Sequence, residues 1–199
     1  MKIFNLTVIL IIISLQIVSA QSGQENKIEG VRTENEYRKT GLLNNTDNFK
    51  FTQKLDKIII EYKFFTVTKK LDCTSEEISI YHNNKRMSIS DISGYYFLGI
   101  KNERFAIFDE GTTNTRGLII YDLFDEKEIF NIVYRGDLVI ENNLIHFKTE
   151  VKINDEKLKP KCPPEIEALS YKIYLEEQYF DFQDLKVNRT GRYICSFIE

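Results

Sequence analysis

The amino-acid sequence predicts an all-β fold built as an antiparallel meander or as stacked sheets, such as a sandwich. Apolar and polar residues alternate over most of the chain after Lys54, which is the period of side chains along a strand. Turn-forming residues separate these runs at intervals of about 8 to 12 residues. The 14 Phe and 11 Tyr residues supply large apolar side chains of the kind that strands favour.

The first 20 residues have the pattern of a cleaved signal peptide. One charged residue, Lys2, precedes an apolar segment, and Val18-Ser19-Ala20 places small residues before a cut. The uninterrupted apolar run Val8–Ile13 is far shorter than the roughly 20 residues that a membrane-spanning helix needs. We therefore expect cleavage after Ala20, and a secreted or periplasmic product without a membrane span.

Residues 21–48 are rich in Gln, Glu, Asn, Lys, Gly and Thr, and such a segment cannot bury enough apolar surface to offset its ordering entropy. We interpret it as a flexible polar leader to a single β-rich domain, residues 49–199. Removal of Lys2 with the signal peptide changes the net charge from −3 to −4. The chain has no block of basic residues, so we do not expect a nucleic-acid partner.

The first part of the domain has the pattern of paired hairpins. In the run from Ile58 to Phe64, the residues Ile58, Ile60, Tyr62 and Phe64 share one predicted face. Asn83-Asn84 predicts a tight turn that leads into a strand at 87–89.

The middle of the domain is the most regular part. Predicted strands, rich in β-branched and aromatic residues, cover 95–100, 105–108, 118–124, 128–134, 138–140 and 144–151. Turn formers separate them at 101–103, 110–114, 125–127, 135–137 and 142–143. One of these, Arg135-Gly136-Asp137, matches an integrin-binding tripeptide, but a turn between two strands accounts for it.

Residues 92–134 resemble one blade of a β-propeller. The resemblance covers a hydrophobic strand, a second strand that ends at Asp109, a loop, and the strand Leu118–Leu123. It implies a stacked or partial-propeller sheet. A complete propeller needs at least four blades of roughly 40 residues each, which would hardly fit in the mature chain.

The last part of the chain contains the single helix signal. Pro163, Pro164 and Glu165 suit the first turn of a short helix near residues 163–169. Strand composition resumes over 171–182 and 192–197, with a period slip in 175–180 that suggests a bulge. The aromatic side chains expected to contact a partner are in the first of these strands, at Tyr174, Tyr179 and Phe180.

Three cysteines in an exported chain predict one disulfide and one cysteine outside it. We favour Cys162–Cys195, because an intervening hairpin and a Pro-Pro corner bring these two residues together. The loop-entropy model assigns roughly 3 to 4 kcal/mol to such a bridge. Cys73 is then interpreted as a small core residue, although His82 lies nine residues away and a nucleophilic cysteine is the alternative.

No local pattern predicts a metal site, a cofactor site or a catalytic site. The cysteines and the two histidines, His82 and His146, lack the paired spacing of zinc ligands. Adjacent residues of a strand point to opposite faces, so Asp109 and Glu110 would not converge on one bond. His146 alternates with Ile145 and Phe147, and we expect it to face solvent.

Two classes of function follow. The sequence favours a non-catalytic exported β-domain that binds a protein or a cell-envelope component through a sheet face or edge, for example a periplasmic inhibitor or immunity-type protein. The alternative is a small secreted hydrolase whose acid and base come from distant strands. Its candidate residues are Asp109, Glu110, Asp122 and His146, which would have to meet in one concave pocket. A third possibility is a subunit that adds an exposed edge strand to a neighbour.

Overall fold

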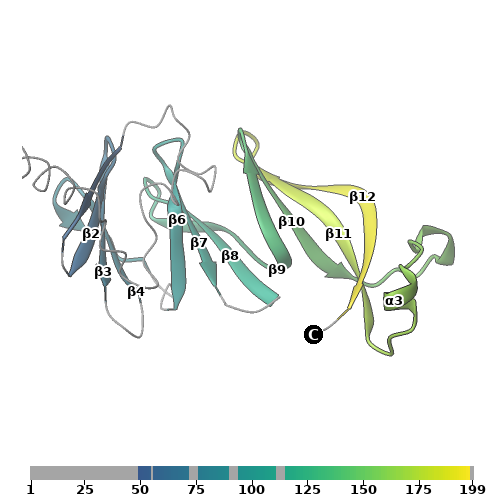
Figure 1. The fold of residues 1–199 in the computed structure, drawn as a ribbon. Helices are drawn as coiled ribbons and strands as arrows, with labels where there is room; N and C mark the ends of the chain where they lie inside the picture. The colour runs from purple at the N-terminus through teal and green to yellow at the C-terminus, as the bar shows by residue number, and fades with distance from the viewer. Residues whose placement is uncertain (1–48, 55, 72–75, 90–93, 111–114, 198–199) are drawn as a thin grey trace, which may run out of the picture. The chain divides into compact units, whose positions relative to one another are not determined.

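A computed structural model describes residues 49–54, 56–71, 76–89, 94–110 and 115–197, all of which belong to one compact unit, Glu34–Glu199. These residues form two antiparallel sheets, and within each sheet every strand pairs with the next strand along the chain (Figure 1). The predicted all-β meander is therefore confirmed. The predicted signal peptide, the leader and Cys73 lie outside the described residues.

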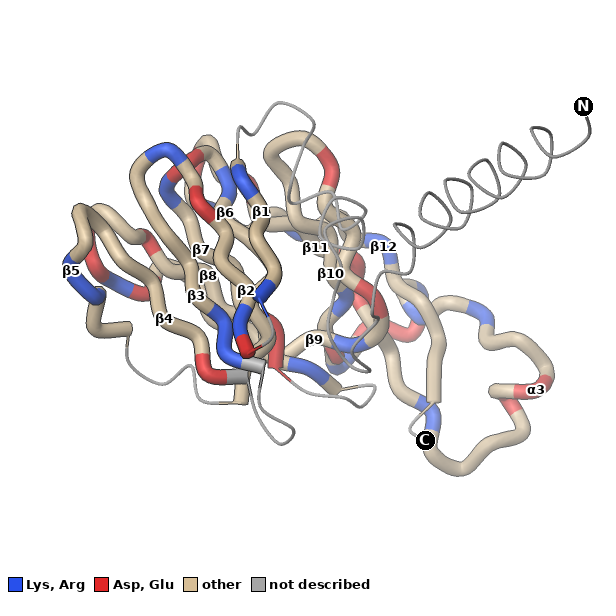
Figure 2. Tube along the Cα trace, turned by 60° about the vertical axis from the view of Figure 1, so that its left-hand side comes forward, with Lys and Arg blue, Asp and Glu red and all other residues tan. Residues whose placement is uncertain are grey.

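The first sheet has five strands in sequential order: β1 (Lys50–Gln53), β2 (Lys57–Glu61), β3 (Phe65–Leu71), β4 (Glu76–His82) and β5 (Lys85–Arg86). The two basic residues of β5 form one edge of this sheet (Figure 2). Ile58 and Ile60 of β2 and Val67 of β3 are fully buried, so one face of the sheet is apolar.

Two sequence expectations for this sheet need correction. Phe64 does not share the inner face with Ile58: the backbone N–H of Tyr62 donates to the carbonyl of Phe65 at 2.8 Å, so the chain reverses and Phe64 lies at the turn, 41% exposed. Asn83 and Asn84 do form the predicted turn, with φ of 50° and 63°. The strand after it, however, is only Lys85–Arg86 and ends before the predicted segment 87–89.

The second sheet has seven strands: β6 (Tyr95–Lys101), β7 (Phe105–Glu110), β8 (Thr115–Asp122), β9 (Lys127–Glu141), β10 (Leu144–Val151), β11 (Lys172–Asp181) and β12 (Lys186–Phe197). Their order is also sequential, from β6 at one edge to β12 at the other. Between β10 and β11 lie a single 3-10 turn, Glu156–Leu158, and the four-residue α3, Pro164–Glu167, in agreement with at most one short helix near 163–169.

Strands β7 and β8 are buried on both faces. Every residue of β7 except Glu110 is buried, and so are the residues from 117 to 122 of β8. The first sheet reaches β6 through the hydroxyl of Tyr62, which accepts a hydrogen bond from the backbone N–H of Ile100 at 3.3 Å. The opposite face of β7 and β8 belongs to a core cluster that extends from β6 to β11 and the residue after it: Leu98, Phe105, Ile107, Leu118, Ile120, Tyr134, Ile145, Phe147, Phe180 and Phe182.

Strand β9 is one strand of 15 residues, whereas the sequence predicted two strands and a turn. Residues 127–135 pair with β8, and the pairing with β10 involves Arg135 and then Val139–Glu141. The register shifts between these two stretches of β9, which marks a β-bulge, and Gly136 within the bulge has a φ of 73°. The predicted turn at Arg135-Gly136-Asp137 is therefore wrong, because the left-handed glycine bends the strand without reversing it.

The predicted period slip in 175–180 is confirmed. The pairing of β11 with β12 shifts between Glu176 and Gln178, and the successive residues Leu175 and Glu176 are both buried. The carboxylate of Glu176 accepts a hydrogen bond from Nε of Arg189 at 2.7 Å, which offsets the cost of its burial.

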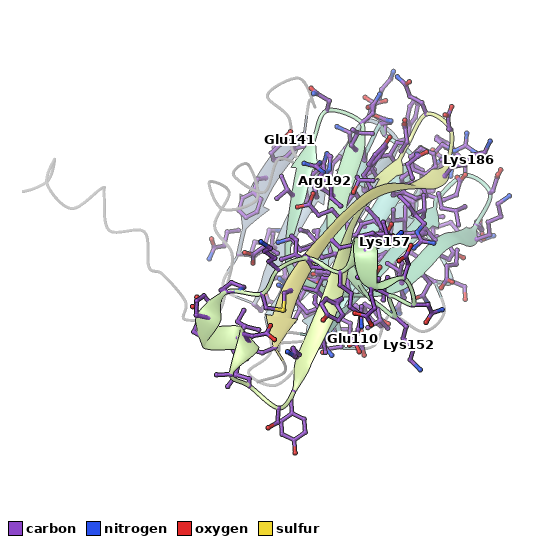
Figure 3. The ribbon with its side chains drawn as sticks, turned by 90° about the vertical axis from the view of Figure 1, so that its right-hand side faces the viewer. Glu110, Glu141, Lys152, Lys157, Lys186 and Arg192 are labelled. Carbon is purple, nitrogen blue, oxygen red and sulfur yellow. A yellow bond between two sulfur atoms is a disulfide. The ribbon has the colours of Figure 1, made fainter. Side chains whose placement is uncertain are left out.

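The predicted disulfide joins Cys162 to Cys195, with a distance of 5.2 Å between their Cα atoms (Figure 3). It ties the segment that carries α3 to β12. The pairing chosen from the sequence is therefore confirmed.

Candidate functional site

The strands β9 to β12 bury one face and expose the other, and we call the exposed one the outer face. On β10, Ile145 and Phe147 are buried in the core cluster. His146 and Lys148 alternate with them along the strand, so their half-buried side chains lie on the outer face. The expectation that His146 faces away from the core is confirmed. A sheet with one solvated face is the usual state of an antiparallel sheet, so only the shape and chemistry of this face can indicate a site.

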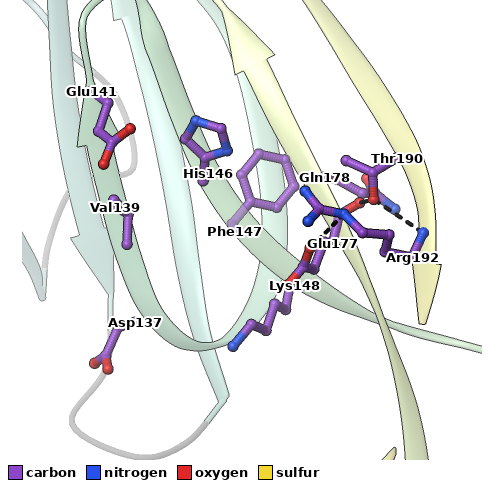
Figure 4. Close-up of a pocket in the computed structure, with 10 residues that line it drawn as sticks. All are labelled: Asp137, Val139, Glu141, His146, Phe147, Lys148, Glu177, Gln178, Thr190 and Arg192. Atoms are coloured by element: carbon purple, nitrogen blue, oxygen red, sulfur yellow. Dashed lines mark hydrogen bonds and ion pairs between the residues drawn. The ribbon is translucent and has the colours of Figure 1, made fainter. Parts of the chain in front are cut away.

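The outer face is hollowed by a groove of about 440 Å³, within the range of small-ligand sites. Figure 4 shows its walls on β9 and β12 and its floor on β10 and β11. The lining residues are Asp137, Val139, Glu141, His146, Phe147, Lys148, Glu177, Gln178, Thr190 and Arg192.

The groove lies between two β-bulges. On β9 the bulge contains Gly136, with a φ of 73°, and on β12 it contains Gly191, with a φ of 70°. The hydroxyl of Thr190 holds the second bulge: it donates to the carbonyl of Glu177 at 2.7 Å and accepts from the backbone N–H of Arg192 at 3.1 Å. Bulges increase local twist and bend a strand, so the pair accounts for the concave shape.

The charges of the groove are only partly neutralised. Nε of Arg192 lies 3.0 Å from Oε2 of Glu177, an ion pair drawn in Figure 4. By contrast, Asp137, Glu141 and Lys148 form no ion pair with any residue in the described part of the chain.

Arg135 lies beside this groove, but its guanidinium is already bound to another residue of the sheet. Its guanidinium donates to Glu150 at 2.9 and 3.2 Å, and only 17% of its side chain is exposed. The tripeptide that begins at Arg135 is therefore part of a strand and is not presented at the tip of a loop.

The structure separates the three predicted contact residues. Tyr179 of β11 pairs in register with His146 on the outer face, and their ring centroids are 5.7 Å apart. Tyr174 is half-buried, and the ammonium of Lys159 lies 6.0 Å from the centroid of its ring. Phe180 is 1% exposed and belongs to the core cluster, so it cannot contact a partner. Its neighbour Tyr179 takes the outer face, because adjacent strand residues point opposite ways.

Of the predicted hydrolase residues, Asp109 is buried inside the fold. It accepts hydrogen bonds from the hydroxyl of Tyr134 at 2.7 Å and from Nε of Arg116 at 3.1 Å, and a second one from Nη2 of Arg116. Burial, followed by the bond to Asp109, raises the pKa of Tyr134 well above its usual range. These contacts occupy the carboxylate, while Glu110 beside it is exposed, as the strand alternation predicted.

Asp122 is also held by an internal ion pair. It accepts from Nε of Arg104 at 3.0 and 2.9 Å and from Nη2 at 2.6 Å, and from the backbone N–H groups of Phe124 and Asp125 at 3.1 and 3.3 Å. Burial alone would raise the pKa of Asp122, but these hydrogen bonds outweigh it and the pKa lies below its usual value.

The four candidate acid and base residues do not meet. Asp109 pairs in register with Leu118, and Asp122 pairs with Phe105, so the two carboxylates lie at opposite ends of the β7–β8 hairpin. Of the four, only His146 lines the groove.

The described residues contain no group of three His, Cys, Asp or Glu side chains that could hold a metal ion. Nor do they include a helix long and apolar enough to cross a membrane. No family model, curated protein or solved structure matches this chain. The likeness of residues 92–134 to a propeller blade stays a prediction.

Of the residues that line the groove, the sequence singled out only Asp137, within the tripeptide, and His146. The signal that could have located its walls is a pair of glycines beside lining residues. Gly136 and Gly191 each stand inside a strand pattern between charged or polar residues, at Arg135-Gly136-Asp137 and Thr190-Gly191-Arg192. A glycine inside a strand is the usual sign of a bulge, and this signal could have identified both walls.

Proposed function

We propose that this protein is an exported, non-catalytic binding protein whose partner contacts the outer face of β9 to β12. The observation that carries the proposal is the concave groove between the two bulges, on the solvated side of a sheet whose other side forms the core. A periplasmic inhibitor or immunity-type protein is one form that such a function takes.

Two exposed valines support a protein partner on this face. Val133 is 63% exposed and Val139 is 48% exposed, and both lie on β9 on the side opposite the buried Tyr134. Single exposed apolar residues are common, but Val139 lines a groove that also carries charges without an ion pair among the described residues, and Val133 lies on the same strand. Apolar contacts within a polar rim are the usual composition of a protein interface.

The face is a better candidate than the β12 edge of the same sheet. Edge strand β12 carries Lys186, Arg189 and Arg192, and its pairing with β11 is interrupted by a bulge. Charged residues and bulges are the features by which natural edges resist the addition of a foreign strand. This argues against a subunit that adds β12 to a neighbour.

Export rests on the signal-peptide pattern of residues 1–20 and on the disulfide. Disulfides persist in oxidising compartments, and Cys162–Cys195 is compatible with the periplasm or the extracellular space. No observation favours the alternative of a secreted hydrolase, because its candidate residues are divided between internal ion pairs and the outer face.

Site-specific photo-crosslinking in the producing cell tests the proposal. A photoreactive benzoylphenylalanine in place of Val133 should yield one discrete adduct with a partner protein. The same group in place of Glu165, an exposed residue of α3 outside the groove, serves as the matched control. Adducts of equal yield from both positions, or from neither, would contradict the proposed binding face.

A further inference from the structure

The β9 wall of the groove has an acidic, apolar, acidic order. Asp137, Val139 and Glu141 occupy alternate positions of β9 and all line the groove (Figure 4). At about 3.3 Å per residue, roughly 13 Å of strand separates Asp137 from Glu141. Val139, between them, is half exposed, and neither carboxylate has an ion-pair partner among the described residues.

We infer that the groove binds an extended segment of a partner protein with Lys or Arg at positions i and i+4 and an apolar side chain at i+2. This rests on the proposed function and names the chemistry of its partner. Alternate side chains of an extended strand share one face and repeat with the spacing of the β9 wall. Each basic group would then lie over a carboxylate, with the apolar side chain against Val139.

The rest of the groove does not compete for the basic side chains. Glu177 is already paired with Arg192 at 3.0 Å, which leaves the accessible negative charge on the β9 side. The net charge of the chain, −3, is also negative, and it favours the approach of a cationic partner.

Lys148 sets the position of the bound segment. It lies on β10, directly opposite Arg135 on one side and Glu177 on the other, and has no ion pair among the described residues. Its ammonium repels a basic side chain placed over β10, whereas the carboxylates attract one placed over β9. Discrimination of this kind uses a repulsive group as well as an attractive one.

The probe is a cyclised β-hairpin peptide that presents Lys-Thr-Val-Thr-Lys on its outer strand, so that little ordering entropy opposes binding. A second hairpin, with Glu at both Lys positions, is the matched control. Binding is measured by fluorescence anisotropy on the full mature chain at low and at moderate ionic strength. We expect the Lys hairpin to bind more tightly than the Glu hairpin, and to weaken as salt is added.

Three variants locate the contact. Removing both carboxylates, Asp137→Asn with Glu141→Gln, should weaken binding of the Lys hairpin about tenfold, since two exposed ion pairs are lost. Removing Lys148 through Lys148→Gln should strengthen it about two- to threefold. The variant Glu165→Gln with Asp184→Asn removes the same charge at exposed residues outside the groove and should change affinity by less than about twofold, through long-range charge alone.

Equal affinity for the two hairpins, or no loss in the double groove variant relative to the double control variant, would overturn the inference. A failure of the Lys hairpin to bind would also overturn it. The crosslink from position 133 is an independent readout, so a positive crosslink with no hairpin binding would reject the cationic segment and retain the binding face.

Discussion

Strands β6 to β8 and strands β9 to β12 belong to one meander, yet they use charge in different ways. In β7 and β8 both faces are buried, and the two buried aspartates, Asp109 and Asp122, are saturated by Arg116, Tyr134 and Arg104. In β9 to β12 one face is open, and Asp137 and Glu141 are left without ion-pair partners among the described residues. The buried carboxylates of β7 and β8 are thus used for the fold, whereas the open face of β9 to β12 keeps two carboxylates that a partner could contact.

The largest expected difference between the regions is in the stability lost when a side chain is truncated to Ala. Phe108→Ala in β7 should lower the free energy of unfolding by about 3 to 5 kcal/mol, because it leaves a cavity in a fully buried strand. Val133→Ala on the outer face should cost less than about 1 kcal/mol, mostly through strand propensity. Urea unfolding of both variants measures this, and similar costs would remove the distinction between the regions.

Reduction of the disulfide should have the next largest effect. Opening Cys162–Cys195 should destabilise the protein by roughly 3 to 4 kcal/mol in the loop-entropy model. The comparison is urea unfolding with and without a reductant, and Cys162→Ser with Cys195→Ser serves as a permanently open form. An unchanged midpoint would mean that β12 is held by the sheet alone.

Acid should weaken the β7–β8 region through Asp122. Its pKa is lowered in the folded state, so its ion pair stabilises the protein above the unfolded value of about 3.9 and the stabilisation is lost as the pH falls through the folded value. Asp122→Asn should cost about 1 to 3 kcal/mol at pH 7, because Arg104 loses a charged partner. The cost should shrink toward pH 2, as unfolding curves at several pH values will show. A cost that does not depend on pH would contradict the charged state of Asp122.

Substitution of the bulge glycine Gly136 should affect stability less than the loss of the disulfide does. Gly136→Ala should cost about 1 to 2 kcal/mol, since an L side chain is strained at a φ of 73°. Space does not contribute, because no atom lies within 4 Å of the added Cβ. Gly136→Asn should cost less, because Asn tolerates the left-handed region. Thermal unfolding ranks the variants, and equal costs for Ala and Asn would exclude backbone strain as the cause.

The sequence predicted much of the fold but little of the groove. Runs such as 105–108 and 118–124 identify β7 and β8, because both of their faces are apolar and no knowledge of the inner side is needed. The Cys162–Cys195 pair also followed from the sequence. The sequence predicted the wrong side for Phe180 because alternation alone does not say which face is buried. The burial of both Leu175 and Glu176 also hides the alternation of β11. Likewise Gly136 was read as a turn, since a left-handed glycine suits a bulge as well as a reversal.

The most direct test of the binding face is backbone amide NMR of residues 21–199 during titration with the Lys hairpin. The account predicts chemical-shift changes in residues 135–150 and 176–192, which contain both bulges and the floor of the groove, and none in β7 or β8. Changes centred on the first sheet, or on the β12 edge without β9, would contradict the assignment of the outer face as the site.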